Sequence, residues 1–246
     1  MKKKFTQFRW LVTMLLLVTA MAMPKMAWAQ VTTSQPTNGN GTAANPYQIT
    51  TAAELAWFRD HVNAGNTTAC ARLEANIDMS TVCHPANKSK SVAELSWVPI
   101  GNNLKRWHGE FNGNNKTISN LYINASGNYS GFFGYAHDWN KGQRGIIKDI
   151  IFENVNITST KEYFGVLAGY AWNTDISGIT VNNGSINGYS YVGGIVGRTQ
   201  SSTTISNCVN RISILGSDYA IGGIVGYVDN STSITNCANY GNVNGE

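Results

Sequence analysis

The chain has 246 residues, of which only 13% are charged, and its formal net charge is +4. Five of its 18 lysines and arginines lie within the segment Met1–Ala29, so the remainder carries 13 basic and 14 acidic residues and is nearly neutral. A nearly neutral chain lacks the basic footprint of a nucleic-acid-binding protein. The abundance of Asn, Gly, Ser and Thr is typical of an exported β-rich protein with many turns.

The segment Met1–Ala29 has the three parts of a secretory signal peptide. A basic segment at 2–9 precedes the apolar run Trp10–Met23, and Ala27-Trp28-Ala29 has the small-x-small pattern of a cleavage site. The apolar run is shorter than the roughly 20 residues that a membrane-spanning helix needs. We therefore predict cleavage after Ala29, and a secreted or cell-surface protein that does not span the membrane once the signal is removed.

A constant spacing recurs through the second half of the chain, at about 29 residues, which lies within the range of known repeat architectures. It separates five isoleucines, and the residue two positions after each of them is Asn, Asp or Gly, types that tolerate left-handed backbone. A fixed period of this size predicts a solenoid, in which each coil covers the open face of the previous one. The isoleucines are Ile118, Ile147, Ile176, Ile205 and Ile234, and the corner residues are Asn120, Asp149, Gly178, Asn207 and Asn236.

Each coil is predicted to hold three short strands, and the third has the pattern Gly-apolar-apolar-Gly. Glycines on both sides of an apolar pair suit a corner where backbones lie close together. The first coil also has a long loop at 135–145. The four glycine-bounded strands are expected at Gly131–Gly134, Gly165–Gly169, Gly193–Gly197 and Gly222–Gly226.

Ahead of the coils, the chain divides into a signal peptide at 1–29, a flexible lead at 30–44, and an N-terminal cap with leading strands at 45–110. The coils occupy 111–246, beginning with a tight Asn/Gly turn at 111–118. The sequence stops before the glycine-bounded strand of the fifth coil, so we expect either a piece of a longer protein or an unfinished last coil. Leading strands are predicted at Tyr47–Ile49, Ala71–Asp78 and Ser96–Ile100.

One helix is predicted, over Thr51–Asn63. Thr51 can cap it, and Glu54, three residues later, completes the pattern of a capping box. Leu55, Phe58 and Val62 fall on one face at helical spacing. A single amphipathic helix before a stack of strands is expected to cover the open end of the first coil.

The recurring Gly-apolar-apolar-Gly strand resembles the GLUG motif of bacterial surface proteins. The segments Gly41-Thr42-x-x-Asn45-Pro46-Tyr47, Ile77-Asp78-Met79 and Trp97-x-Pro99-Ile100-Gly101 also resemble the opening of such proteins in Bacteroidales and some Firmicutes. The resemblance implies a right-handed parallel β-helix. Together with the repeat and the helix signal, it predicts an all-β solenoid with about 29 residues per coil and a short N-terminal capping helix. It also implies an adhesin-like surface location. GLUG repeats accompany IgA-cleaving metallopeptidases, but the chain contains no His-Glu-x-x-His motif.

The four cysteines after the signal peptide fall into two pairs. Cys70 and Cys83 flank a predicted strand in the irregular region before the coils, so export permits a disulfide between them. Cys208 and Cys237 share one apolar column of adjacent coils, where stacked parallel side chains seldom have disulfide geometry. A metal site from Cys70, Cys83 and His84 lacks a spaced fourth ligand, so we predict no metal and no cofactor.

The best candidate for ligand binding is the long loop of the first coil with the matching corner one coil later. Aromatic rings beside polar groups suit stacking on a sugar or docking of a protein, although the same rings can simply pack the loop against the solenoid. The candidate residues are Tyr135, His137, Asp138, Trp139, Lys141, Arg144, Tyr170 and Trp172.

These observations predict a non-catalytic surface or adhesion module that binds glycans or host or partner surface proteins. The charged residues do not stack into a catalytic group, which a glycosidase or lyase would need. Two alternatives stay open: a carbohydrate-active β-helix enzyme of the polysaccharide lyase type, and a structural stalk of a larger surface protein.

Overall fold

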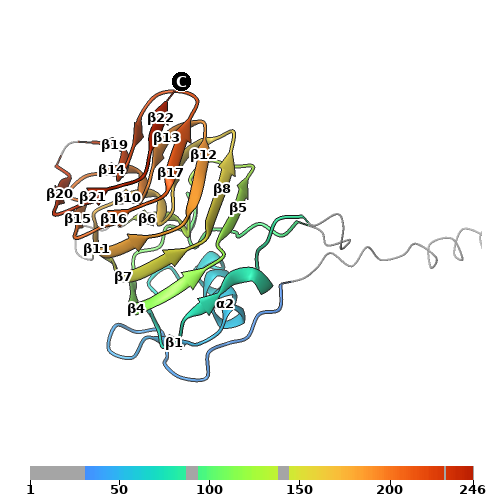
Figure 1. Ribbon diagram of the computed structural model, residues 1–246. Helices are drawn as coiled ribbons and strands as arrows, with labels where there is room; N and C mark the ends of the chain where they lie inside the picture. Colours follow the sequence, from blue (N-terminus) through green and yellow to red (C-terminus); the bar gives the residue numbers. More distant parts are fainter. Residues whose placement is uncertain (1–30, 87–93, 138–143, 230, 246) are drawn as a thin grey trace, which may run out of the picture. The chain divides into compact units, whose positions relative to one another are not determined.

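A computed structural model describes residues 31–86, 94–137, 144–229 and 231–245. The predicted signal peptide lies outside these ranges. In the described part, the strands form four parallel sheets that run along a stack of coils, as the resemblance implied (Figure 1). The protein is therefore an all-β parallel solenoid.

The largest sheet contains one segment from each turn of the chain, in the order β1-β2-β4-β7-β11-β15-β20. β3 joins it through β4, β16 pairs with β11, and β21 pairs with β16. Its strands are β1 (Tyr47–Ile49), β2 (Ala71–Leu73), β3 (Ile77–Asp78), β4 (Glu110–Ser119), β7 (Gly145–Glu153), β11 (Thr174–Val181), β15 (Thr204–Ser206), β16 (Val209–Asn210), β20 (Ser233–Thr235) and β21 (Ala238–Asn239).

Three smaller sheets complete the coils. One contains β5 (Tyr122–Ala125), β8 (Val155–Ser159), β12 (Gly184–Gly188), β17 (Ser213–Gly216) and β22 (Val243–Gly245). The next contains β9 (Glu162–Gly165), β13 (Ser190–Gly193) and β18 (Ile221–Gly222). The last contains β6 (Phe133–His137), β10 (Ala168–Trp172), β14 (Val196–Gln200) and β19 (Val225–Val228).

The predicted third strand of each coil is in fact a corner between two strands. Gly193 ends β13 and Val196 begins β14, and the same bend separates β9 from β10 and β18 from β19. The expected single strand at each Gly-apolar-apolar-Gly is therefore wrong. The glycines lie at the bend, where two segments of backbone approach each other.

The predicted register is confirmed for the later coils. Ile147, Ile176, Ile205 and Ile234 are direct partners across β7, β11, β15 and β20. Of the corner residues, Asp149 has φ 57° and Gly178 has φ 65°. Asn207 and Asn236 likewise adopt positive φ.

The register predicted for the first coil is wrong. Phe111, not Ile118, lies opposite Ile147, and Ile118 lies opposite Phe152. The register shifts between Asn112 and Lys116, so the expected Asn/Gly turn is a bulge inside β4. Because a bulge inserts residues into one strand without breaking the sheet, the regular spacing from Ile118 to Ile147 has no structural meaning.

Asn120 consequently belongs to a different corner from the one predicted. It does adopt positive φ, at 60°. Its backbone N–H, however, donates to the carbonyl of Glu153, which precedes Asn154 with φ 53°. The sequence therefore predicted the left-handed backbone of Asn120, but not the residue of the next coil that lies beside it.

The interior changes from aromatic to aliphatic and polar along the stack. Phe111 packs edge-to-face on Phe132 and Phe133 at ring distances of 5.5 and 5.6 Å. In later coils the buried Asn210 donates from Nδ2 to Oδ1 of Asn239 at 2.7 Å. A buried amide needs such partners.

Paired glycines make room for these two asparagines. A Cβ added at Gly194 would lie 2.6 Å from Cγ of Asn210, and one added at Gly223 would lie 2.4 Å from Cγ of Asn239. Real Cβ contacts are not this short. The second glycine of each Gly-Gly pair therefore allows an amide inside the coil.

Helix α2 (Ala52–Asn63) confirms the predicted helix and its cap. The Thr51 hydroxyl accepts from the Glu54 backbone at 3.2 Å, and the Glu54 carboxylate accepts from the Thr51 backbone at 3.1 Å. Leu55, Phe58 and Val62 are fully buried. Phe58 lies 5.9 Å from the ring of Phe111. The helix therefore covers the interior of the first coil.

Three expectations about the N-terminal region need correction. The lead at 30–44 is tied to the cap, because Ser34 donates its N–H to the carbonyl of Ala53 and Gly41 accepts from Cys70. The strand expected at Ala71–Asp78 is split into β2 and β3, and a 3-10 turn at Met79–Thr81 follows. Residues 96–100 form no strand, and Ile100 alone makes an isolated bridge, to Phe133.

Within the described residues, no helix combines the length and the apolar character that spanning a bilayer requires.

Replacing Thr51 by Ala should lower the free energy of unfolding by about 1 kcal/mol, because the helix loses its N-cap acceptor. Urea denaturation monitored by circular dichroism measures this. The matched control is Thr68→Ala, at an exposed threonine that does not cap helix α2. Equal destabilisation by the two changes would contradict a role for the capping box.

Candidate functional site

The structure brings four of the predicted binding residues together in two columns. Tyr135 on β6 is the register partner of Tyr170 on β10, and His137 is the partner of Trp172. The ring centroids of Tyr135 and Tyr170 are 4.6 Å apart, and those of His137 and Trp172 are 4.5 Å apart. His137 and Tyr170 are buried, at 1% and 4% exposure. Asp138, Trp139 and Lys141 lie outside the described residues.

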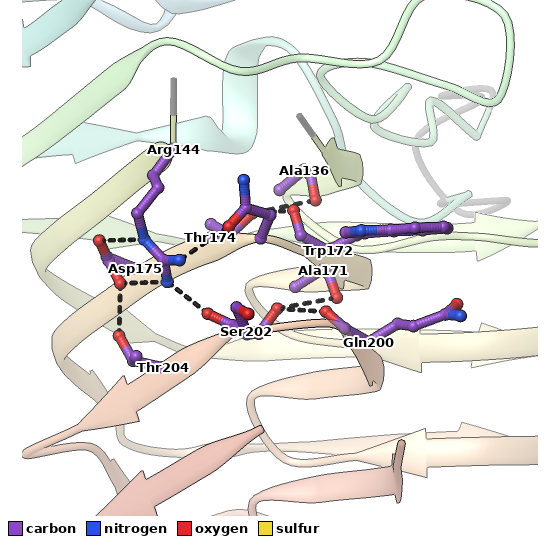
Figure 2. A network of polar contacts seen from close by, with 11 residues as sticks. Ala136, Arg144, Ala171, Trp172, Thr174, Asp175, Gln200, Ser202 and Thr204 are labelled. Atoms are coloured by element: carbon purple, nitrogen blue, oxygen red, sulfur yellow. Dashed lines mark hydrogen bonds and ion pairs between the residues drawn. The ribbon is translucent and has the colours of Figure 1, made fainter. Parts of the chain in front are cut away.

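Arg144 lies apart from these columns and makes hydrogen bonds to other residues of the solenoid. Its guanidinium makes two hydrogen bonds to the Asp175 carboxylate, at 2.7 and 2.6 Å. A further N–H donates to Oδ1 of Asn173 at 2.7 Å, and another reaches the carbonyl of Ser202. Figure 2 shows this network. Since these contacts reach the next two coils, Arg144 fixes the end of the first-coil loop to both of them.

Threonines continue this network beside Arg144. Thr204 donates to Asp175 at 2.6 Å. The Thr174 hydroxyl lies within hydrogen-bond distance of the carbonyls of Ala136 and Trp172, and the Thr203 hydroxyl lies within that distance of those of Ala171 and Gln200. The corner between β10 and β11 is thus held by side-chain hydroxyls, which the sequence analysis did not foresee.

A ladder of tyrosines is the main feature that the sequence analysis missed. The rings of Tyr129 and Tyr163 stack at 4.8 Å with an interplanar angle of 9°, and those of Tyr163 and Tyr191 stack at 4.5 Å and 17°. All three residues adopt positive φ, between 54° and 70°. A non-glycine residue in this region is uncommon, so its recurrence marks one corner of successive coils.

A second column stands beside this ladder. Tyr135, Tyr170, Arg198 and Tyr227 are successive register partners on β6, β10, β14 and β19. The Arg198 guanidinium lies 5.5 Å from the ring centroid of Tyr170 and 5.2 Å from that of Tyr227. These distances fit cation–π contacts. We call the two columns together the tyrosine–arginine face: Tyr129, Tyr163, Tyr191, Tyr135, Tyr170, Arg198 and Tyr227.

The last glycine of each corner explains why the two columns touch. A Cβ added at Gly197 would lie 2.7 Å from the backbone carbonyl carbon of Tyr163, and one at Gly226 would lie 2.7 Å from that of Tyr191. Only glycine lets the strand pass this close to the tyrosine corner of the coil before. The residue that follows the glycine, Arg198 or Tyr227, is thereby placed against the ladder.

The pattern was present in the sequence. A tyrosine stands two residues before the first glycine of three corners, at Tyr129, Tyr163 and Tyr191, and a tyrosine or arginine directly follows the last glycine. In the fourth corner the extra residue Ala220 takes the positive-φ place, at 64°. Tyr219 there extends the ladder, with its ring 4.8 Å from Tyr191.

The electrostatics of this face favour neutral tyrosines and a retained arginine cation. Burial raises the pKa of Tyr170 to about 12 and also raises the pKa of Tyr135. Burial alone would lower the pKa of Arg198, but Tyr170 and Tyr163 raise it above its ordinary value. Asp229 lies 3.5 Å from Arg198 and balances its charge. The face therefore offers hydroxyl groups, ring edges and one paired cation.

The predicted Cys70–Cys83 disulfide is wrong, because all four described cysteines are free thiols. Cys70 accepts from the backbone N–H of Glu110 at 3.2 Å, and Cys83 accepts from that of Tyr122 at 3.3 Å. Each sulfur thus contacts a different segment of the first coil. Burial raises the pKa of Cys83 to about 11, so this thiol is a weak nucleophile.

Among the residues that the structure describes, no group of three or more His, Cys, Asp and Glu side chains is arranged to hold a metal ion. Several carboxylates are instead paired with cations, including Asp175 with Arg144 and Glu110 with Lys148, the latter at 2.7 Å.

These features define the class of the protein: a parallel β-helix whose coils carry aligned aromatic side chains on one face. Residues 217–244 match the family described as "The GLUG motif". This segment near the end of the chain is similar to the motif that the resemblance in its sequence indicated.

Two further similarities accompany this match. The chain is 28% identical over 204 residues to a "Putative Gly-rich membrane protein" of Evansella cellulosilytica, and the match covers 68% of this chain. It spans only 21% of that relative's length. A crystal structure described as a "putative immunoglobulin A1 protease" from Bacteroides ovatus superposes with a TM-score of 0.61 at 20% identity, covering 84% of this chain and 69% of that one. At this identity the likeness concerns the fold alone.

Replacing Gly197 by Ala should lower the free energy of unfolding by roughly 1–3 kcal/mol, the usual cost of overpacking, because the new methyl group meets the backbone at Tyr163. Thermal denaturation measures the change. Gly127→Ala is the matched control, since a Cβ there meets nothing within 4 Å. If both variants melt alike, close backbone approach is not what requires glycine at this corner.

The Arg144–Asp175 pair should stabilise the fold in a pH-dependent way. Hydrogen bonds from Arg144 hold the pKa of Asp175 below its ordinary value. The stabilisation is therefore present above an ordinary carboxyl pKa of about 4 and is lost as the pH falls through the depressed pKa. We expect Asp175→Asn to be destabilised relative to the parent near pH 6, and the difference to shrink towards pH 3.

Chemical denaturation across this pH range provides the measurement, with Asp218→Asn as an acidic control outside the network. A stability difference for Asp175→Asn that does not change between pH 6 and pH 3 would contradict this role for the carboxylate.

Proposed function

We propose that this protein is an exported, non-catalytic surface module that binds an extracellular glycan or a surface protein through the tyrosine–arginine face. The observation that carries the proposal is the alignment of tyrosines and an arginine on one side of a rigid stack of coils. Tyr and Arg dominate the energetically important positions of protein interfaces. They are here repeated at the spacing of adjacent strands.

The face is preorganised for binding. The tyrosine rings are held by one another, and their backbone is fixed by the glycine contacts described above. Because such side chains have little rotamer freedom left to lose, binding would cost little conformational entropy. Tyr163 is stacked between Tyr129 and Tyr191, so the middle of the ladder presents ring edges and hydroxyl groups rather than a broad aromatic platform.

Two observations favour binding over catalysis. Two carboxylates near the candidate residues, Asp175 and Asp229, are engaged by Arg144 and Arg198. The tyrosine hydroxyls are poor general bases, because burial raises the pKa of Tyr135 and Tyr170. A polysaccharide lyase or glycosidase needs titratable groups available to the substrate.

Export is supported by the signal-peptide pattern of Met1–Ala29. A surface location is also supported by the membrane-protein name of the Evansella relative. A stalk within a longer surface protein is compatible with the same solenoid. A stalk differs from the proposed module in having no ligand.

Removing the two exposed tyrosines at the end of the face should weaken binding by roughly tenfold or more. Tyr219 and Tyr227 are 54% and 40% exposed, and an aromatic contact contributes about 0.5–1.5 kcal/mol beyond its area. The measurement compares the protein with its Tyr219→Ala, Tyr227→Ala variant on glycan arrays, mucin and immobilised surface proteins.

The matched control is Tyr240→Ala. Tyr240 is also exposed and also lies near an arginine, Arg211, but it belongs to a different corner of the coil. Equal binding by both variants would remove the tyrosine–arginine face from consideration. Turnover of a polysaccharide would overturn the non-catalytic proposal, and a protein without any ligand would act as a stalk.

A further inference from the structure

A groove of about 350 Å³ lies at the first end of the tyrosine ladder. Its walls are two segments, 96–102 and 123–130, and Tyr129 borders it. This volume is at the lower end of the range for small-molecule sites. The groove therefore has room for one or two small rings, not for a folded partner.

Tyr129 is the first ring of the ladder. Tyr163 covers one of its faces, at 4.8 Å and 9°. The other stacked rings, beginning with Tyr191, continue beyond Tyr163. Tyr129 lines the groove together with Val98 and Pro99 of segment 96–102. Tyr135, inclined at 55°, packs against Tyr129 from the side of β6.

The lining of the groove is polar but uncharged. Asn, Ser and glycine residues surround a few apolar side chains, and among the described residues no Asp, Glu, Lys or Arg lines the groove. Amides and hydroxyls supply both donors and acceptors. The polar lining residues include Ser96, Asn102, Asn124, Ser126 and Asn128.

Part of this polar rim is held in place by its own hydrogen bonds. The backbone N–H of Asn124 donates to the Ser96 hydroxyl at 2.9 Å. Oδ1 of Asn128 accepts from the backbone of Glu162 at 3.2 Å. Oδ1 of Asn102 accepts from Leu104 and Lys105, both at 2.9 Å. The rim is therefore preorganised, and a ligand need not order it.

We infer that this groove binds a neutral pyranose unit of a glycan, stacked on the side of the Tyr129 ring opposite Tyr163. A pyranose has an apolar face of C–H groups and a rim of neutral hydroxyls. This combination matches one aromatic face, the 54% exposed side chain of Val98, and a rim of amides and hydroxyls. A sialic acid or a sulfated sugar would find no cation in the lining. The inference rests on the proposed binding function and names its ligand class.

Four variants of the full mature protein test the assignment. Tyr129→Ala removes the ring, whereas Tyr129→Phe keeps the ring and removes only the hydroxyl. Gly127→Trp fills the groove, because a side chain at this position meets nothing within 4 Å and Gly127 lines the groove. Gly127→Ala is its matched control. Thermal melts and circular dichroism establish that each variant is folded.

The probes are galactose-, mannose- and N-acetylglucosamine-terminated oligosaccharides, with sialylated counterparts. Binding is measured by saturation-transfer NMR and by titration. We expect at least one neutral oligosaccharide to bind, with a loss of at least tenfold in Tyr129→Ala and Gly127→Trp. Tyr129→Phe and Gly127→Ala should bind within about twofold of the parent.

The outcomes separate this inference from the proposed function. If a neutral glycan binds the parent, Tyr129→Ala and Gly127→Trp equally, the groove assignment fails while the binding function stands. Binding of sialylated probes alone would overturn the assignment of a neutral pyranose as the ligand. Binding only of a protein, through Tyr219 and Tyr227, would overturn it as well. A parent protein that binds no glycan and no protein would overturn both.

Discussion

In-register stacking of parallel strands is the constraint on which the rest of this structure depends. Adjacent strands lie about 4.8 Å apart, so a residue type that recurs at the coil period is placed in contact with its own copies. The buried isoleucines at 147, 176 and 205 fill the interior in this way. The same spacing brings the buried Asn210 to Asn239 of the last coil, and it brings Tyr129, Tyr163 and Tyr191 into a ladder on the outer side.

Close backbone approach at the glycine corner connects the interior with the surface. The second glycine of a Gly-Gly pair accommodates an interior amide, and the last glycine accommodates the tyrosine corner of the previous coil. One short glycine motif therefore determines the packing on both the inner and the outer side of the coil. This explains why the aromatic columns are regular although no tyrosine of the ladder is fully buried.

The beginning of the stack is irregular, and this irregularity creates the groove. Segment 96–102 makes one isolated bridge, from Ile100 to Phe133, rather than a strand, and it leaves room beside Tyr129 that a regular coil would fill. Helix α2 supports this segment, since Asn63 donates to the Pro99 carbonyl and accepts from the Gly101 N–H. The cap thus closes the solenoid and also positions one wall of the candidate sugar site.

The sequence alone determined the helix with its capping box, the solenoid class and the register of the later coils. These features depend on local patterns or on a constant period, both of which can be read along the chain. The register of the first coil was decided by a bulge in β4. The sequence did not show this, because extra residues in a strand and in a loop can together reproduce the spacing of the regular coils. The free thiols of Cys70 and Cys83 and the pairing of Arg144 with Asp175 also required the fold. The tyrosine ladder joins residues from separate coils, and the spacing of these tyrosines was visible in the sequence. Only the tertiary structure showed that their rings stack. Stacking depends on the positive φ of each tyrosine and on the glycine that packs against its backbone.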